Sequence, residues 1–331
     1  MSADHAHRTL SRLLLPLMLF AALVTTSVYA ETTTNTTKTL AYLVSDNRIP
    51  FWNILNRGIQ SQAESLGYQV HTLSANNQAK QELQNTLEAI REGVSGIIVS
   101  PTNSSACVTI LEFANQAKIP VVIADIGTEK GDYVSYISSN NYQGAYQIGQ
   151  VLTQKMHALN WQDGSVGIIA IPQARQNGKE RTEGFLKALA EAKIKGAGIR
   201  QQVTFSYQET YDFSKELIQQ NPELKALWLQ GSDRYQGALD AIHDTGKDKQ
   251  ILLLTFDAEP VFLELIPNQV LVGAAMQQPF LMGVTAVTAL DDFLQGKKVS
   301  PHIKLSVLAV SESNIEQLMP LIRKNVLGLN E

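Results

Sequence analysis

The sequence predicts an α/β protein built from two doubly wound parallel-sheet lobes. Three observations lead to this prediction. The 331 residues are too many for one domain of ordinary size. Short apolar runs alternate with amphipathic stretches along the body of the chain. The apolar runs are nearly continuous, which is typical of parallel strands that are covered on both faces.

The first half of the body contains five expected strands and four expected helices, with no helix between the fourth strand and the fifth. Gly67 ends the first helix, and Pro120 opens the fourth strand because it cannot continue the helix before it. We expect strands at 40–45, 68–73, 96–100, 120–124 and 134–137, and helices at 51–66, 78–91, 104–118 and 142–159.

The second half continues the same alternation. So many units exceed the width of one typical sheet, and two sheets are therefore expected. The polar segment 138–141 is a good place for the chain to cross between them, and the lack of a long linker elsewhere indicates several short crossings. We expect strands at 165–170, 199–204, 225–229, 251–255 and 271–275, and helices at 176–192, 212–220, 234–245, 259–266 and 280–294, with an extra helix at 315–326.

The first 30 residues have the pattern of a secretory signal peptide. A basic start is followed by an apolar run at 13–24 and by small residues before Glu31. The run is shorter than the ~20 residues of a membrane-spanning helix, which disfavours an anchor. We expect residues 1–30 to be cleaved and residues 31–37 to be a flexible lead-in, so that the mature protein is exported.

Composition excludes several classes of function. The net charge of −4 and the lack of any Lys/Arg run disfavour a nucleic-acid partner. Cys107 is the only cysteine, so neither an internal disulfide nor a cysteine metal site can form. We expect no cofactor and no metal, because the histidines show no metal-ligand spacing. These histidines include His71, His157, His243 and His302.

Two aspartates mark the expected ligand site. Asp125 and Asp257 each follow a strongly apolar strand. Ligands of parallel sheets lie beyond the carboxyl ends of the strands, where a carboxylate can accept hydrogen bonds from neighbouring hydroxyls. The alternative for a single aspartate is a cap on the following turn. Two aspartates on different units favour binding.

Aromatic and amide side chains accompany these aspartates. Phe51 and Trp52 follow the first strand; one is expected in the core, while the other covers an apolar ligand face. Phe205 ends another strand and either closes the pocket from the opposite side or belongs to the core. Gln277 can donate and accept together, which suits hydroxyl recognition or a hydrogen bond at the hinge.

The ordered set of motifs resembles the ribose-type periplasmic sugar-binding proteins, the type I periplasmic binding proteins that are related to the ligand domains of sugar-responsive repressors. The resemblance covers nearly all of the expected mature chain, although no single motif decides it. Its elements are Pro50-Phe51-Trp52, Gly96-Ile97-Ile98-Val99-Ser100-Pro101, Ile119-Pro120-Val121-Val122 with Asp125, Lys179 with Arg181 and Glu183-Gly184-Phe185, Phe256-Asp257, and Gln277 with Pro279.

The resemblance implies a hinge of three crossings between the lobes. Lobe one would comprise residues 38–139 plus 278–306, and lobe two residues 140–277 plus 307–331. The implied activity is non-enzymatic: the lobes close on a small polar ligand, sugar or sugar-like, and present it in the periplasm to an ABC transporter. An alternative partner is a membrane sensor kinase or chemoreceptor.

Two other classes of function are weaker. Asp125 and Asp257 could form the acid/base pair of a periplasmic carbohydrate-active enzyme, but nothing in the sequence tunes them, and the G-x-S-x-G, H-E-x-x-H and P-loop motifs are absent. A transcriptional regulator would need a helix-turn-helix at the N-terminus, where the signal peptide stands.

The resemblance also implies which positions contact the ligand. This chain matches the family pattern at some of these positions and differs from it at others. Ile49, Ile126 and Gly231 stand where the family pattern has Asn, Arg and Asn, and Lys179 replaces an arginine. Fewer hydrogen-bond donors disfavour ribose itself and favour a less hydroxylated or differently shaped compound. Lys179 and Arg181 cannot both point the same way on a helix, so one faces the cleft while the other stays in solvent. The alternative for Lys179 is a surface pair with Glu183. The implied ligand-binding residues are Phe51, Trp52, Asp125, Lys179, Phe205, Asp257 and Gln277.

Overall fold

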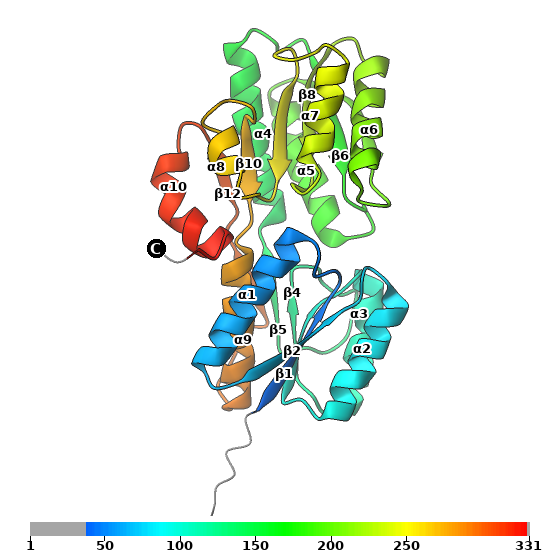
Figure 1. The fold of residues 1–331 in the computed structure, drawn as a ribbon, viewed down its shortest axis with the longest axis vertical. Coiled ribbons are helices and arrows are strands. Elements are labelled where there is room, and N and C mark those ends of the chain that lie inside the picture. The colour runs from blue at the N-terminus through cyan, green and yellow to red at the C-terminus, as the bar shows by residue number, and fades with distance from the viewer. Residues whose placement is uncertain (1–37, 330–331) are drawn as a thin grey trace, which may run out of the picture. The chain divides into compact units, whose positions relative to one another are not determined.

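The computed structural model of the protein describes residues 38–329. The predicted signal peptide and lead-in, residues 1–30 and 31–37, lie outside this range. Within it the chain forms two α/β lobes, each built around one six-stranded sheet (Figure 1). None of the helices described is both long enough and apolar enough to span a bilayer.

Lobe one is a sheet with the strand order β11-β5-β4-β3-β1-β2, in which all neighbouring strands are parallel. Its elements are β1 (Thr39–Val44), α1 (Pro50–Ser65), β2 (Gln69–Ser74), α2 (Ala79–Glu92), β3 (Gly96–Ser100), α3 (Ser104–Gln116), β4 (Val121–Ala124), β5 (Ser135–Ser139), α9 (Pro279–Leu294) and β11 (His302–Leu305).

Both faces of this sheet are covered, as its continuous apolar strands predict. Tyr42 and Val44 of β1 pack toward α1 and α9, whereas Leu43 between them packs toward α2 and α3 (Figure 1). Helices α1 and α9 approach so closely that a Cβ on Gly58 would come within 2.2 Å of the Phe280 carbonyl oxygen. Gly58 therefore permits the close contact of the two helices.

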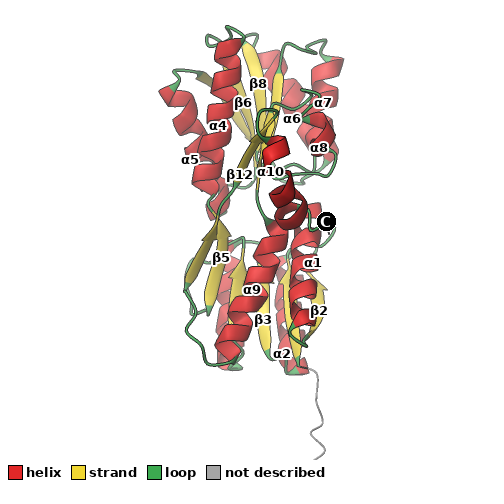
Figure 2. Ribbon diagram, turned by 90° about the vertical axis from the view of Figure 1, so that its left-hand side faces the viewer, coloured by secondary structure: helices red, strands yellow, loops and turns green. Residues whose placement is uncertain are grey.

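Lobe two has the strand order β12-β10-β9-β8-β6-β7, parallel except for the antiparallel edge pair β10–β12. Helices α4 and α5 cover one face (Figure 2). Its elements are α4 (Asn141–Ala158), β6 (Ser165–Ala170), α5 (Gln176–Glu191), β7 (Lys195–Gln201), α6 (Tyr207–Gln220), β8 (Leu224–Leu229), α7 (Tyr235–Asp244), β9 (Leu252–Phe256), α8 (Phe262–Leu265), β10 (Gly273–Met276), β12 (Leu308–Ser311), α10 (Ile315–Leu321) and a π-helical turn at Ile322–Val326.

Three chain segments cross between the sheets: β5 to α4, β10 to α9, and β11 to β12. The predicted fold class, two doubly wound lobes with a three-crossing hinge, is confirmed. The C-terminal segment also reaches lobe one, because Arg57 of α1 donates hydrogen bonds to the carbonyls of Leu327 and Gly328. Another contact at the hinge joins Asn325 Nδ2 to Gln278 Oε1 at 2.9 Å.

Several boundaries differ from the sequence prediction. Strand β7 lies at Lys195–Gln201 rather than 199–204, since its glycine-rich start gives no apolar run. The edge strands β11 and β12, four residues each, have no counterpart in the prediction. The predicted helix at 315–326 is α-helical only from Ile315 to Leu321 and continues as a π-helical turn. Pro320 lies inside the α-helical part and has no backbone N–H group to donate to it.

Candidate ligand-binding cleft

Side chains from both lobes line one cavity at the carboxyl ends of the strands. We call it the inner compartment; about 510 Å³ of its space is free of protein atoms, part of it open to solvent. Six of the seven side chains predicted for the site line it. They are Phe51, Trp52, Asp125, Phe205, Asp257 and Gln277.

The two aspartates occupy equivalent places in the two lobes. Asp125 directly follows β4 and Asp257 directly follows β9. Their backbone N–H groups donate to the carbonyls of Ile137 and Ala275 on the neighbouring strands, both at 2.9 Å. Both residues have a left-handed φ, 67° and 69°, which aspartate tolerates better than most residues. This turn of the backbone places each carboxylate beyond the end of its strand.

The Asp257 carboxylate is held by an arginine and an amide. Gln277 Nε2 donates to Asp257 Oδ1 at 2.6 Å, and Arg181 Nη1 lies 3.6 Å from Oδ2. Arg181 itself is fixed by Asn141 Oδ1 at 2.9 Å and by the Gln230 carbonyl at 2.7 Å. Burial raises the pKa of Asp257, and the Arg181 charge opposes this shift. Asp257 is thus a rigid, oriented acceptor.

Asp125 is much less satisfied. The residue is 3% exposed, and the only hydrogen bond of its carboxylate among the described residues is a long one, 3.4 Å, from Asn177 Nδ2 to Oδ2. Its Oδ1 has no partner within residues 38–329, and neither does Oε1 of Gln277, a residue that is 1% exposed. Burial raises the pKa of Asp125 to about 6. This cavity therefore contains two buried acceptors that have no hydrogen-bond donor among the described residues.

Aromatic rings enclose the cavity. The rings of Phe51 and Trp52 lie edge to face, with centroids 4.9 Å apart. Trp52 is 5% exposed and also packs in the lobe-one core, whereas Phe51 is half-buried. Phe205 lines the cavity from lobe two, and its carbonyl accepts a hydrogen bond from Arg234 Nε. Both lobes thus supply apolar surface to the same space.

The structure corrects the placement of Lys179. This residue lies exposed on α5, outside the inner compartment, while Arg181 is 3% exposed and lines that compartment. Residues two apart on a helix point in nearly opposite directions, so only one of the two can face the cleft.

Sequence reasoning missed several lining side chains that the structure brings to the inner compartment. Gln202 and Gln230 are the first residues after β7 and β8, and the strand-end criterion used for the aspartates applies to them equally. Arg175, Asn177 and Asp233 carry no comparable sequence signal, because they lie in loops or at helix starts.

Two of the three positions where Ile or Gly replaces an expected polar residue lie in the cleft. Ile49 and Gly231 line the inner compartment. Ile126 is 1% exposed and packs in the lobe-one core instead. At the two lining positions, Ile49 and Gly231 offer a ligand no side-chain hydrogen bond.

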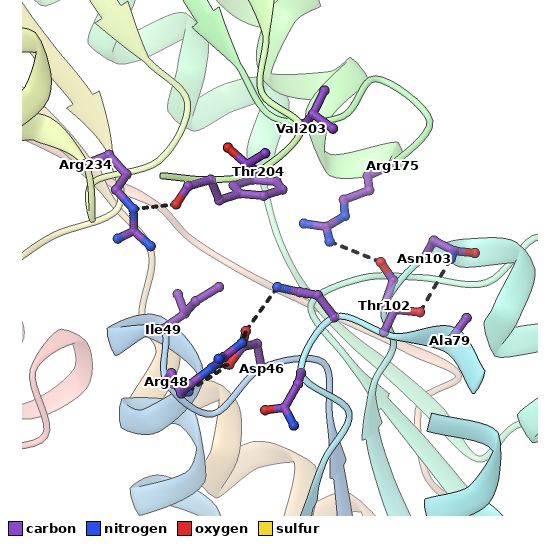
Figure 3. A pocket seen from close by; sticks show the side chains of 13 residues that line it. Asp46, Arg48, Ile49, Ala79, Thr102, Asn103, Arg175, Val203, Thr204 and Arg234 are labelled. Atoms are coloured by element: carbon purple, nitrogen blue, oxygen red, sulfur yellow. Dashed lines mark hydrogen bonds and ion pairs between the residues drawn. The ribbon is translucent and has the colours of Figure 1, made fainter. Parts of the chain in front are cut away.

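The cleft also has a wider outer compartment (Figure 3). It shares Ile49, Arg175 and Phe205 with the inner one. It encloses about 1240 Å³ outside the protein atoms, including open solvent. Arg175 Nη2 of lobe two donates to the Thr102 carbonyl of lobe one at 3.1 Å, across this space. Its other lining residues include Asp46, Arg48, Asn77, Ala79 and Arg234.

Among the described residues, one cluster of potential metal ligands lies elsewhere, at the edge of lobe one. His71 of β2 meets Glu88 and Glu92, which stand one turn apart on α2, with the ligand atoms within 4.8 Å of one another. His71 Nδ1 lies 2.8 Å from Glu92 Oε2. The spacing of these residues in the sequence did not indicate the cluster, because it forms only when the strand and the helix pack together.

Comparison with known proteins identifies the family. Residues 40–298 match the periplasmic binding protein domain family. The chain belongs to this family. The ribose import binding protein RbsB of Bacillus subtilis (strain 168) is 30% identical to this periplasmic binding protein over 269 residues, 80% of this chain and 84% of RbsB. The predicted resemblance is confirmed.

More distant similarities fit the same family. The transcriptional repressor PurR of Proteus mirabilis is 26% identical over 64% of this chain and 60% of the repressor. A carbohydrate transporter solute-binding protein from Agrobacterium radiobacter, solved with D-arabinose, has a TM-score of 0.80 at 20% identity and covers 88% of this chain and 100% of its own. The second comparison supports the fold alone.

Family membership decides between the predicted classes of function. Periplasmic binding proteins are binding proteins rather than enzymes, so the non-enzymatic prediction is confirmed. The family also assigns the protein to the periplasm, while the predicted signal peptide lies outside the described residues. A sensor kinase or chemoreceptor as partner stays a prediction.

Proposed function

We propose that this periplasmic binding protein captures one small hydroxylated ligand, a sugar or sugar-like compound, in the inner compartment and presents it to an ABC transporter. The observation that carries the proposal is the pair of buried acceptors without partners among the described residues, Asp125 Oδ1 and Gln277 Oε1. The import function in the name of its relative RbsB supports the transport role.

Hydroxyl groups suit these acceptors because each can donate one hydrogen bond and accept others. A hydrogen bond to a charged group contributes roughly 1.5–3 kcal/mol, so hydroxyls on Asp125 and Asp257 would supply much of the binding free energy. The rings of Phe51 and Phe205 offer flat apolar surfaces to the C–H faces of a sugar ring. Ile49 and Gly231 favour a ligand other than ribose.

Capture requires both lobes. Asp125 and Phe51 belong to lobe one, whereas Asp257 and Phe205 belong to lobe two. A ligand that contacts both lobes binds the closed arrangement more tightly and shifts the population toward it. The transporter then recognises the closed form of the binding protein, which is the form that holds ligand.

The test is calorimetric titration of a panel of sugars, polyols and sugar acids, starting with whatever compound co-purifies with the natively expressed protein. Asp257→Asn should weaken binding by at least about tenfold, because it removes the charge from an oriented acceptor. The matched control is Asp163→Asn, an exposed residue outside the cleft. Small-angle scattering should show compaction on saturation.

Unchanged affinity in Asp257→Asn, or the same radius of gyration with and without saturating ligand, would refute the proposed capture mechanism. Binding of non-hydroxylated compounds alone would refute the ligand class.

A further inference from the structure

The charges of the outer compartment are not balanced. Its lining carries three arginines and one aspartate. Two of the arginines are compensated: Arg48 binds Asp46 with contacts of 2.6 and 2.8 Å, and Arg234 Nη1 lies 2.6 Å from Asp233. The third, Arg175, forms no ion pair within the described part of the chain.

Arg175 is placed to meet a ligand. Its side chain lines both compartments, donates one hydrogen bond to the Thr102 carbonyl, and lies 5.6 Å from the centroid of the Phe205 ring (Figure 3). It is half-buried, and desolvation lowers its pKa. A guanidinium has five N–H donors, so most of those on Arg175 stay available.

Helix N-termini add positive potential at the same place. The residues that precede α1, α5 and α7, namely Ile49, Arg175 and Arg234, line the outer compartment, as does Ala79, the first residue of α2. Side-chain caps are lacking at all four N-termini among the residues described. The helix dipoles favour an anion near these N-termini, although part of the first-turn N–H groups is already bonded: Gly178 donates to Asn177 Oδ1 and Gly237 to the Arg234 carbonyl.

The inner compartment gives a second, independent indication of a ligand. Asp125 Oδ1 and Gln277 Oε1 are buried acceptors without partners in residues 38–329, and their compartment shares Arg175 with the outer one. A ligand that fills both compartments therefore needs hydrogen-bond donors in the inner one and negative charge beside Arg175 in the outer one.

We propose that the ligand is a sugar-like compound that carries an anionic group, phosphate or carboxylate. Its hydroxylated ring lies in the inner compartment, and the anion contacts Arg175 and the helix N-termini of the outer one. This inference rests on the proposed function and specifies its ligand class. With a neutral sugar, only the more distant carboxylates of Asp125 and Glu82, among the residues described, would oppose the charge of Arg175, and no group of this part of the chain would form a direct ion pair with it when the lobes close. Burying a charge without an ion-pair partner is costly.

The test uses matched pairs of neutral and anionic compounds in calorimetric titrations. The pairs are D-ribose with D-ribose 5-phosphate, D-glucose with D-glucose 6-phosphate, and D-galactose with D-galacturonate; the third pair separates carboxylate from phosphate recognition. We expect at least one anionic member to bind at least about tenfold more tightly than its neutral partner. Raising the salt from about 50 to about 300 mM should reduce this preference.

Variants assign the preference to the arginine. Arg175→Gln should weaken binding of the anionic member more than that of its neutral partner, so that the anion preference is lost, and Arg175→Lys should retain part of the preference. The matched control is Arg200→Gln. Arg200 lies on β7, outside the cleft, and is paired with Glu216 of α6. Urea denaturation of each variant checks that the fold is retained.

The possible results separate the inference from the function. If neutral sugars bind with Asp257-dependent affinity but no anion binds more tightly than its partner, the anion inference is wrong and the proposed function stands. If no member of any pair binds, the sugar-like ligand class fails together with the inference. An anion preference that persists in Arg175→Gln overturns the assignment of the subsite.

Discussion

Replacing Asp125 by asparagine should stabilise the ligand-free protein and weaken ligand binding at the same time. The substitution keeps the size of the side chain, and asparagine tolerates the left-handed φ of 67° at this position. It removes the charge of a carboxylate that is 3% exposed and has one oxygen without a partner among the described residues.

The size of the stabilisation follows from the pKa. Burial raises the pKa of Asp125 from 3.8 to about 6. The folded state therefore binds the proton more tightly than the unfolded state, and stability is lost as the pH rises from about 4 through 6. At about 1.4 kcal/mol per pKa unit, ionisation costs up to about 3 kcal/mol above pH 6. Asp125→Asn should recover up to this amount at pH 8 and almost none near pH 4.

Binding should change in the opposite direction. An amide oxygen accepts one hydrogen bond without charge assistance, so the loss should be roughly 1.5–3 kcal/mol, at least about tenfold in affinity. Urea denaturation at the two pH values and calorimetric titration measure the two effects. The control is Asp163→Asn. A variant that is destabilised at pH 8 and binds ligand as tightly as the wild type would refute this reasoning.

Two further predictions concern stability. Glu82 is 1% exposed and accepts hydrogen bonds from the N–H and Oγ1 of Thr102, and burial raises its pKa to about 7. Its contribution to stability therefore falls by about 2 kcal/mol between pH 5 and pH 8, and Glu82→Gln should flatten that part of the pH profile; equal slopes would contradict it. Gly58→Ala should destabilise the protein by at least about 1–3 kcal/mol, because the new Cβ would overlap the Phe280 carbonyl. Gly196→Ala, where a Cβ meets no atom within 4 Å, should be nearly neutral by comparison.

Much of the site follows from one rule of parallel sheets. Asp125 and Asp257 are each the first residue after a buried strand, and the fold necessarily brings such residues to the carboxyl edge of a sheet. The rule also applies to Gln202 and Gln230, which line the same cavity. Strand ends were therefore the strongest sequence signal for this site.

Other features depend on contacts that a linear pattern does not encode. The choice between Lys179 and Arg181 rests on the rotation of α5, which brings Arg181 against Asp257 and Phe256. The strand β11 has four residues, and pairing with β5 rather than its own composition defines it. Arg175 precedes a helix without a capping interaction, and only the folded arrangement sets it beside Thr102.

The most direct test of the two-lobe site is a crystal structure of the periplasmic binding protein with the compound that it retains from the periplasm. We predict a ligand between the lobes, with donor groups within hydrogen-bond distance of Asp125 Oδ1 and Gln277 Oε1. A ligand bound at another surface, with both of these oxygens still lacking a donor, would contradict the account.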